Sequence, residues 1–205
     1  MLFCICHWSE GDIRVSWLIA GLIIFIGMHS IRIVGEAPRE ALIGRIGEMA
    51  YKGTYGLVSL VGLILIGQGY REAQATAGAL YTPSESLSHL ALVLVPIAFV
   101  LAAAAYVPAG HIKRLARHPM VLGVAFWAGG HLIANGMLAD VVLFGSLLAW
   151  AVLDYLAAVR RNAHPVASSE VSLKGDVIAV VVGFVATIAF VLWLHQWLFG
   201  VAPIG

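Results

Sequence analysis

The sequence has few charged residues and almost no cysteine, and these two scarcities limit what the protein can be. Only 11% of its 205 residues are Asp, Glu, Lys or Arg, whereas 61% are hydrophobic. Soluble domains carry about 25% charged residues, so the composition predicts an integral membrane protein. The net charge of +1 provides no basic surface, and nucleic acid is therefore not expected as a partner.

The two cysteines, Cys4 and Cys6, stand beside His7 in a short N-terminal segment. A structural zinc site needs four ligands, so this set is incomplete. Residues 1–14 lack the basic start of a signal peptide, and the apolar run that follows has no small-residue cleavage site. We therefore expect residues 1–14 to be a tail, and residues 15–205 to form a single membrane domain that keeps this first apolar run.

Six apolar runs are long enough to cross a bilayer, which takes about 20 residues. They cover residues 15–34, 53–70, 84–107, 119–138, 140–159 and 177–199. The pattern predicts an all-α, polytopic membrane bundle of about six helices embedded in the lipid bilayer. A short amphipathic helix at 38–50 is expected to lie on the cytoplasmic membrane surface. Glycines recur in the runs, and small residues let membrane helices approach closely.

The basic residues predict the orientation of the chain in the membrane. Ten of the twelve Lys and Arg residues fall in the first, third and fifth connections between the apolar runs, if Arg32 at the end of the first run is counted with the first connection. Connections rich in Lys and Arg stay in the cytoplasm. Both termini are therefore expected on the opposite side of the membrane.

No Asp, Glu, Lys or Arg lies deep in any predicted span, which argues against a pump or channel built on buried carboxylates. Two histidines do lie in spans: His29 in the first and His131 in the fourth. Each alone is equally well explained by an interhelical hydrogen bond. Together, two histidines on different spans suit the axial ligation of haem iron.

The surroundings of both histidines fit a flat cofactor. Phe25 and Gly21 share a helical face with His29, and Trp127 precedes His131 by one turn, so aromatic and small residues could form a slot. The stripe to which His131 belongs runs Pro119, Gly123, Trp127, His131, Asn135 at four-residue spacing. Propionates would find partners in Arg32 and in the cluster Lys113, Arg114 and Arg117.

Depth in the membrane leaves the second ligand open. At about 1.5 Å per helical residue, His29 lies near the cytoplasmic end of its span and His131 near the outer end of the fourth. The two differ by roughly 10 Å on this count. His118 matches the depth of His29 better, but it stands between Arg117 and Pro119 at a helix start. Holding that helix start explains His118 as well as ligation does.

Two groups of residues resemble the NnrU family over roughly residues 15–160. The first is Gly27-Met28-His29-Ser30 with Arg32. The second is Arg117-His118-Pro119 with Gly123, Trp127, His131 and Asn135-Gly136. The family comprises bacterial membrane proteins associated with denitrification and nitric oxide metabolism, and it is related to zeta-carotene isomerase, a haem b enzyme. By motif, the haem ligands of that relative fall on His29 and His131.

The resemblance implies a haem b-binding protein of the bacterial inner membrane, with both termini periplasmic, that handles a diatomic gas or electrons. An alternative is a haem-dependent cis-trans isomerase acting on a lipid-soluble polyene. The isomerase, however, has a cysteine where Ala128 stands here. A second alternative is a membrane methyltransferase, since such enzymes share Arg117-His118-Pro119 with Gly123. Their later Glu-rich motif is missing, because residues 160–175 offer only Glu170.

Overall fold

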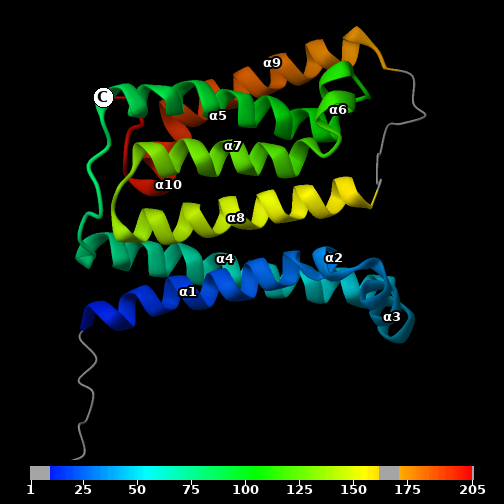
Figure 1. Cartoon of the computed structure of the whole chain (residues 1–205), viewed down its shortest axis with the longest axis horizontal. Helices are drawn as coiled ribbons and strands as arrows, with labels where there is room; N and C mark the ends of the chain where they lie inside the picture. Colours follow the sequence, from blue (N-terminus) through cyan, green and yellow to red (C-terminus); the bar gives the residue numbers. More distant parts are fainter. Residues whose placement is uncertain (1–9, 162–170, 205) are drawn as a thin grey trace, which may run out of the picture. The chain divides into compact units, whose positions relative to one another are not determined.

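The computed structural model describes residues 10–161 and 171–204, and over these ranges the chain is helical (Figure 1). Extended pairing within the described residues is confined to one isolated bridge between Ala79 and Met137. The helices are α1 (Glu10–His29), α2 (Ile31–Val34), α3 (Glu36–Ile46), α4 (Glu48–Thr76), α5 (Glu85–Tyr106), α6 (His111–Ala116), α7 (Pro119–Ala134), α8 (Leu138–Arg160), α9 (Leu173–Ala189), the π-helix η1 (Phe190–Leu194) and α10 (His195–Phe199). Cys4, Cys6, His7 and Glu170 lie outside the described residues.

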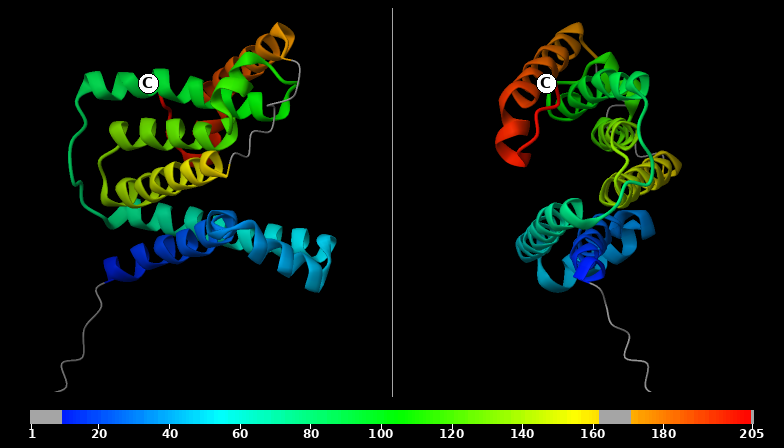
Figure 2. Two further views of the ribbon diagram at one scale, coloured as in Figure 1. Left: turned by 45° about the vertical axis from the view of Figure 1, so that its right-hand side comes forward. Right: turned by 90° about the vertical axis from the view of Figure 1, so that its left-hand side faces the viewer.

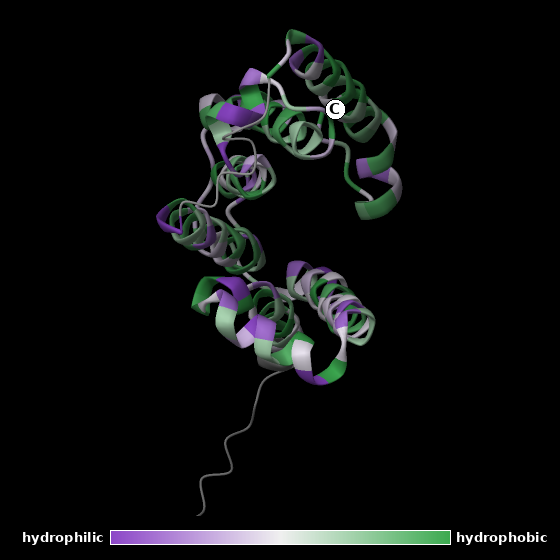
Figure 3. Cartoon of the chain, turned by 90° about the vertical axis from the view of Figure 1, so that its right-hand side faces the viewer, coloured by the Kyte–Doolittle hydropathy of each residue, from purple (hydrophilic) through white to green (hydrophobic). Residues whose placement is uncertain are grey.

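The expected all-α membrane bundle is confirmed. Four helical segments are long and apolar enough to cross a membrane: Glu48–Thr76, Glu85–Tyr106, Leu138–Arg160 and Leu173–Phe199. Two shorter apolar helices, Val15–His29 and Pro119–Ala134, occupy the remaining two predicted spans. The ribbon of α9 is mostly in the hydrophobic colour in Figure 3, and many large apolar side chains of α5 and α9 are exposed, as expected of helices that face lipid.

The residues cluster into two compact units. Unit 1 comprises Met1–Pro83 and Asn135–Ser146, and unit 2 comprises Ser84–Ala134 and Leu147–Gly205. Helix α8 contributes its first residues to unit 1 and the rest to unit 2. In unit 1, α1 packs along α4 (Figure 2). In unit 2, α5 packs against both α7 and α9.

Glycines bring the backbones of α1 and α4 together in unit 1. A Cβ atom added at Gly21 would lie 2.6 Å from the backbone nitrogen of Ile66, and one at Gly62 would lie 2.9 Å from that of Phe25. One at Gly69 would meet the backbone of Leu18. Residue numbers along α4 fall as those along α1 rise, so the two helices are antiparallel. At each glycine the missing side chain lets the two backbones come into direct contact.

Unit 2 uses the same device on both sides of α5. A Cβ at Gly123 would lie 3.0 Å from the carbonyl oxygen of Ala98, and one at Gly183 would lie 2.5 Å from the Cα of Val100. The sequence predicts that helices approach closely at the glycines of the runs, but the structure shows this at only some of them. An added Cβ at Gly27, Gly56 or Gly145 would meet no described atom within 4 Å.

The amphipathic segment after the first span forms a helix that is shorter than predicted. The segment 38–50 was expected to be one helix, but α3 covers Glu36–Ile46 and α4 begins at Glu48. Gly47 separates them with a φ of 84°, a backbone conformation that glycine adopts without strain. Leu42, Ile46 and Met49 are exposed, which leaves an apolar surface suited to lie against lipid.

Candidate functional site

His29 is the last residue of α1, so it stands at the end of its span. Its Nδ1 atom lies 2.7 Å from the carbonyl oxygen of Phe25, one turn earlier. The imidazole stacks on the Phe25 ring at a centroid distance of 4.1 Å and tilts against Tyr55 at 5.2 Å. Two aromatic rings therefore restrict how the His29 imidazole can turn.

His131 has the same local arrangement on α7. Its Nδ1 atom lies 2.9 Å from the carbonyl oxygen of Trp127, again one turn earlier. The Trp127 and His131 rings are 4.9 Å apart between centroids. The predicted pairing of Trp127 with His131 on one face is therefore present.

The shared contact defines what the two histidines can do chemically. A carbonyl oxygen only accepts hydrogen bonds, so Nδ1 must carry the proton and donate it in both residues. In the neutral ring Nε2 then holds the lone pair, which is the atom that ligates a metal. Histidines that bind metals commonly donate their other N–H to a backbone carbonyl in this way.

The slot expected beside His29 is filled by protein. Gly21 was expected to leave room for a flat cofactor on the face of His29. Instead, α4 occupies this space, because the backbones of Ile66 and Gly62 come within 3 Å of the Cβ that Gly21 lacks. Phe25 remains in contact with His29, through the stacked ring. A flat group at His29 would therefore have to lie beyond the α1–α4 contact.

The basic residues expected to meet propionates have protein partners here. Arg32 on α2 donates to the Glu36 carboxylate at 2.7 Å, and both side chains are partly exposed. Lys113 donates from Nζ to the carbonyl oxygens of Ala105 and Val107, at the end of α5. A positive group at a helix C-terminus satisfies unpaired carbonyls there, so Lys113 caps the C-terminus of α5.

Arg117 and His118 form the turn between α6 and α7. Arg117 is exposed and ends α6 with a φ of 58°, a conformation uncommon for residues other than glycine. The His118 carbonyl accepts from the Leu122 backbone N–H at 3.1 Å, which starts α7. The His118 ring meets Tyr155 of α8 edge-on at a centroid distance of 6.2 Å. These contacts give His118 the helix-start role that was one of its two expected explanations.

Asn135 lies beyond the end of the helix that was expected to carry it. Helix α7 stops at Ala134, so the polar stripe leaves the helix after His131. The Asn135 carbonyl accepts from the Tyr81 hydroxyl at 2.8 Å. Burial and the nearby Asp140 charge raise the pKa of Tyr81 above its ordinary value, so this phenol keeps the proton that it donates.

The sequence reading missed a buried carboxylate, Asp140, in the first turn of α8. Asp140 is 2% exposed. Its Oδ1 accepts from the Tyr70 hydroxyl at 2.6 Å and from the Gln74 amide, and its Oδ2 accepts from the Met137 backbone N–H at 2.9 Å. Tyr70 and Gln74 are one turn apart near the end of α4. Two sequence features could have indicated this network. Tyr70 and Gln74 are four residues apart and so share a helix face, and Asp140 stands three residues after Met137, as a residue that accepts from a nearby backbone N–H can.

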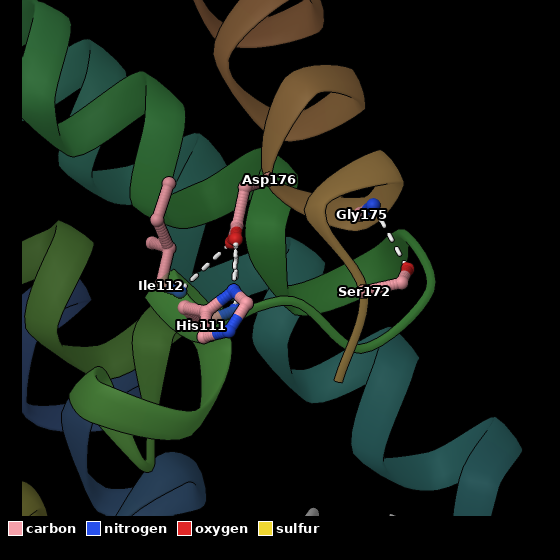
Figure 4. Close-up of polar contacts among 5 residues, drawn as sticks. All are labelled: His111, Ile112, Ser172, Gly175 and Asp176. Atoms are coloured by element: carbon pink, nitrogen blue, oxygen red, sulfur yellow. Dashed lines mark hydrogen bonds and ion pairs between the residues drawn. The ribbon is translucent and has the colours of Figure 1, made fainter. Parts of the chain in front are cut away.

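A second missed carboxylate, Asp176, joins α6 to α9 in unit 2 (Figure 4). Its oxygens accept from the backbone N–H groups of His111 at 3.0 Å and Ile112 at 2.8 Å, and its Oδ2 lies 2.7 Å from His111 Nδ1. A carboxylate at the first N–H groups of a helix satisfies donors that the helix itself cannot. Gly110 and Gly175 allow this approach, since a Cβ on either would clash with the facing backbone.

Asp176→Ala is expected to lower the free energy of unfolding by about 1–2 kcal/mol, because the start of α6 loses its acceptor. Unfolding of the detergent-solubilised protein, followed by far-ultraviolet circular dichroism, would measure it. Lys174→Ala, an exposed change in the same turn of α9, is the matched control and should be near neutral. Equal midpoints for the two variants would contradict the helix-capping role.

The structure groups the expected site residues within each unit. In unit 1, His29 lies near Arg32, and in unit 2 Trp127 lies against His131. Among the described residues no three His, Cys, Asp or Glu side chains gather to hold a metal ion. Axial haem ligation takes only one or two protein ligands, so this finding does not bear on it.

The chain is thus a polytopic helical membrane protein whose apolar helices carry histidines with a fixed ring tautomer. A family profile described as "NnrU protein" matches residues 17–203, and the chain belongs to that family. No curated protein and no solved structure matches it. The resemblance drawn from the His29 and His131 motifs is therefore confirmed at the level of the family.

Proposed function

We propose that the protein binds haem b in the bacterial inner membrane, with His29 and His131 as axial ligands, and serves nitric oxide metabolism or denitrification. The observation that carries the proposal is the shared state of the two histidines. Each donates Nδ1–H to the carbonyl one turn earlier, and each has an aromatic ring beside it. Both thus direct the lone pair of the neutral ring to Nε2.

His131 is preferred to His118 as the second ligand. His118 sits in the turn that starts α7, with its ring edge-on to Tyr155. His29 and His131 share the Nδ1 contact to the carbonyl one turn earlier, and both lie at the positions of the family motif. This shared arrangement favours the motif-based assignment over the one based on membrane depth.

When bound, the haem would supply an iron centre able to carry an electron, or to bind a diatomic gas once one of the two histidines leaves the iron. The chain's own residues would hold that iron. The flanking rings of Phe25 and Tyr55 restrain the His29 imidazole, and the Trp127 ring restrains that of His131. The isomerase alternative gains no support, since the Ala128 side chain is fully buried and offers no thiol.

The test is the visible spectrum of the purified protein, oxidised and reduced, for the wild type and single alanine variants. We expect a low-spin haem b spectrum that is lost or converted to high spin in His29→Ala and in His131→Ala. His118→Ala should retain it, because that ring has no ligand role in the proposal. His89→Ala, which alters an exposed histidine, is the matched control.

Two results would overturn the proposal. One is a wild-type protein that stays colourless after haem is supplied to the membranes. The other is a low-spin spectrum that survives both His29→Ala and His131→Ala. If His118→Ala abolishes the spectrum and His131→Ala does not, His118 is the second ligand and the depth argument was right.

A further inference from the structure

A pocket of about 270 Å³ opens at the end of α1, and most of its lining, including Arg39 and Lys52, lies outside the residues assigned to haem. It is lined by Met28, His29, Ile31, Arg32, Arg39, Tyr51, Lys52 and Tyr55. Three of these side chains are cationic, and none of the eight is acidic. We propose that this pocket binds the anionic phosphate group of a ligand at the membrane surface.

The pocket is bounded by elements that the sequence predicts to lie at the cytoplasmic face. His29 ends α1, Arg39 lies on α3, and Lys52 lies in the first turns of α4. The neighbouring residues Val34 and Met49 are 80% and 82% exposed. Such large apolar side chains are suited to lipid contact, so the pocket opens where acyl chains and headgroups meet.

Aromatic contacts hold part of the cationic lining in place. Tyr51 is 8% exposed, and the Arg39 guanidinium lies over its ring at 5.7 Å from the centroid. The Tyr51 and Tyr55 rings are 6.2 Å apart, and Tyr55 in turn contacts His29. A guanidinium resting on a buried ring keeps its N–H groups available to an oxyanion while losing little freedom.

The acidic residues nearby neutralise the pocket only in part. Glu36 pairs with Arg32 at 2.7 Å and lies 3.7 Å from Arg39, and Glu48 pairs with Lys52 at 2.7 Å. Three cations against two carboxylates leave a positive excess. The Lys52–Glu48 pair is 64% and 65% exposed, and exposed pairs of this kind are weak. A phosphate with several acceptor oxygens can therefore compete for Lys52 and Arg39.

The size of the pocket limits what it holds. Pockets for whole drug-sized ligands run from about 300 to 1,000 Å³, so a volume of about 270 Å³ suits a polar group and not an entire amphiphile. Met28 and Ile31 give the pocket an apolar side, which suits a phosphate headgroup that is joined to acyl chains. A free phosphate ion carries similar oxygens but has no apolar part, and the experiment distinguishes the lipid from the free ion.

The experiment is native mass spectrometry of the intact protein released from nanodiscs containing phosphatidylglycerol and phosphatidylcholine in equal amounts. The wild type should retain phosphatidylglycerol in preference. In Arg39→Gln/Lys52→Gln the preference should fall by about thirtyfold, as expected for the loss of two basic contacts to an anionic lipid. Arg45→Gln/Arg71→Gln removes the same charge from α3 and α4 at residues outside the lining and should leave the preference unchanged.

Inorganic phosphate, added at increasing concentration, distinguishes the sources. Displacement of phosphatidylglycerol only at high concentration supports the lipid headgroup. Binding of phosphate alone to the wild type but not to Arg39→Gln/Lys52→Gln supports the same site with a soluble ligand. Equal retention of both lipids by the wild type, without phosphate binding, overturns the proposal, as does an equal loss in both double variants.

The pocket shares His29 and Arg32 with the residues assigned to haem, but the variants tested leave both unchanged, so the two proposals can fail separately. Arg39 and Lys52 have no role in the proposed ligation, so the Arg39→Gln/Lys52→Gln protein should keep the visible spectrum of the wild type. A colourless protein that still prefers phosphatidylglycerol would leave the pocket in place and remove the haem. Lost lipid preference with an intact spectrum in the double variant is the expected pattern.

Discussion

Gly69→Ala is expected to lower the free energy of unfolding by about 3 kcal/mol, near the upper end for overpacked cores. The new Cβ would meet the backbone nitrogen of Leu18 and lie 2.7 Å from its Cα. Backbone atoms within a helix cannot rotate away as a side chain can. The two helices would have to separate, and each nearby contact would be lost with them.

Unfolding in mixed micelles with increasing sodium dodecyl sulfate, followed by circular dichroism, measures this loss. Gly56→Ala is the matched control on the same helix, because its Cβ would meet no described atom within 4 Å. That variant should be neutral or slightly stabilising, since alanine favours helix more than glycine does. If both variants unfold at the same detergent fraction, the backbones of α1 and α4 are not in close contact at Gly69.

A second readout separates packing from site chemistry. Helix α1 ends at His29, so a displaced α1 should also disturb the imidazole and its contact with Tyr55. Gly69→Ala should therefore weaken haem retention, if haem is bound, without touching a ligand. Gly56→Ala should leave it unchanged.

Much of the fold could be predicted from hydropathy, because the bilayer demands long apolar helices and little else resembles them. The six runs therefore fell where the apolar helices lie. The roles of individual glycines could not be predicted in this way. Gly21, Gly62 and Gly69 face a neighbouring backbone, whereas Gly27 and Gly56 do not, and this depends on the rotation of each helix about its axis.

The histidines show the same division between local and non-local information. The i−4 carbonyl contact of His29 and of His131 follows from helix geometry within one segment. The end of α1 at His29 and the occupation of the space beside Gly21 depend on neighbours. Helix α4 fills the space expected beside Gly21. The Nδ1–H tautomer of His29, which suits ligation through Nε2, does not depend on that space.

Asp140 was missed for a related physical reason. An acid in the first turn of a helix is an ordinary sequence feature, because it favours the helix N-terminus. Only the fold brings Tyr70 and Gln74 from α4 to the same carboxylate, 66 to 70 residues away along the chain. The expectation that no acid lies deep in a span therefore overlooked a carboxylate that is 2% exposed at the end of one.

Asp140→Ala is expected to lower the free energy of unfolding by about 3 kcal/mol, because three part-buried donors, on Tyr70, Gln74 and Met137, lose the carboxylate that accepts from them. Asp140→Asn should lower the free energy of unfolding by less, because one oxygen still accepts. The loss should not vanish, since the new NH2 group then faces a donor of Tyr70, Gln74 or Met137. Tyr70→Phe removes a single donor and should cost about 1 kcal/mol. The same detergent titration measures all three.

The order of these losses tests the network more sharply than any one value. Glu72→Ala changes an exposed carboxylate between Tyr70 and Gln74 on α4 and should be near neutral. An Asp140→Ala protein as stable as Glu72→Ala would mean that water replaces the carboxylate. Since Tyr70→Phe and Asp140→Ala remove parts of one contact, the double variant should lose little more than Asp140→Ala alone. Additive losses would show that Tyr70 and Asp140 stabilise the fold independently.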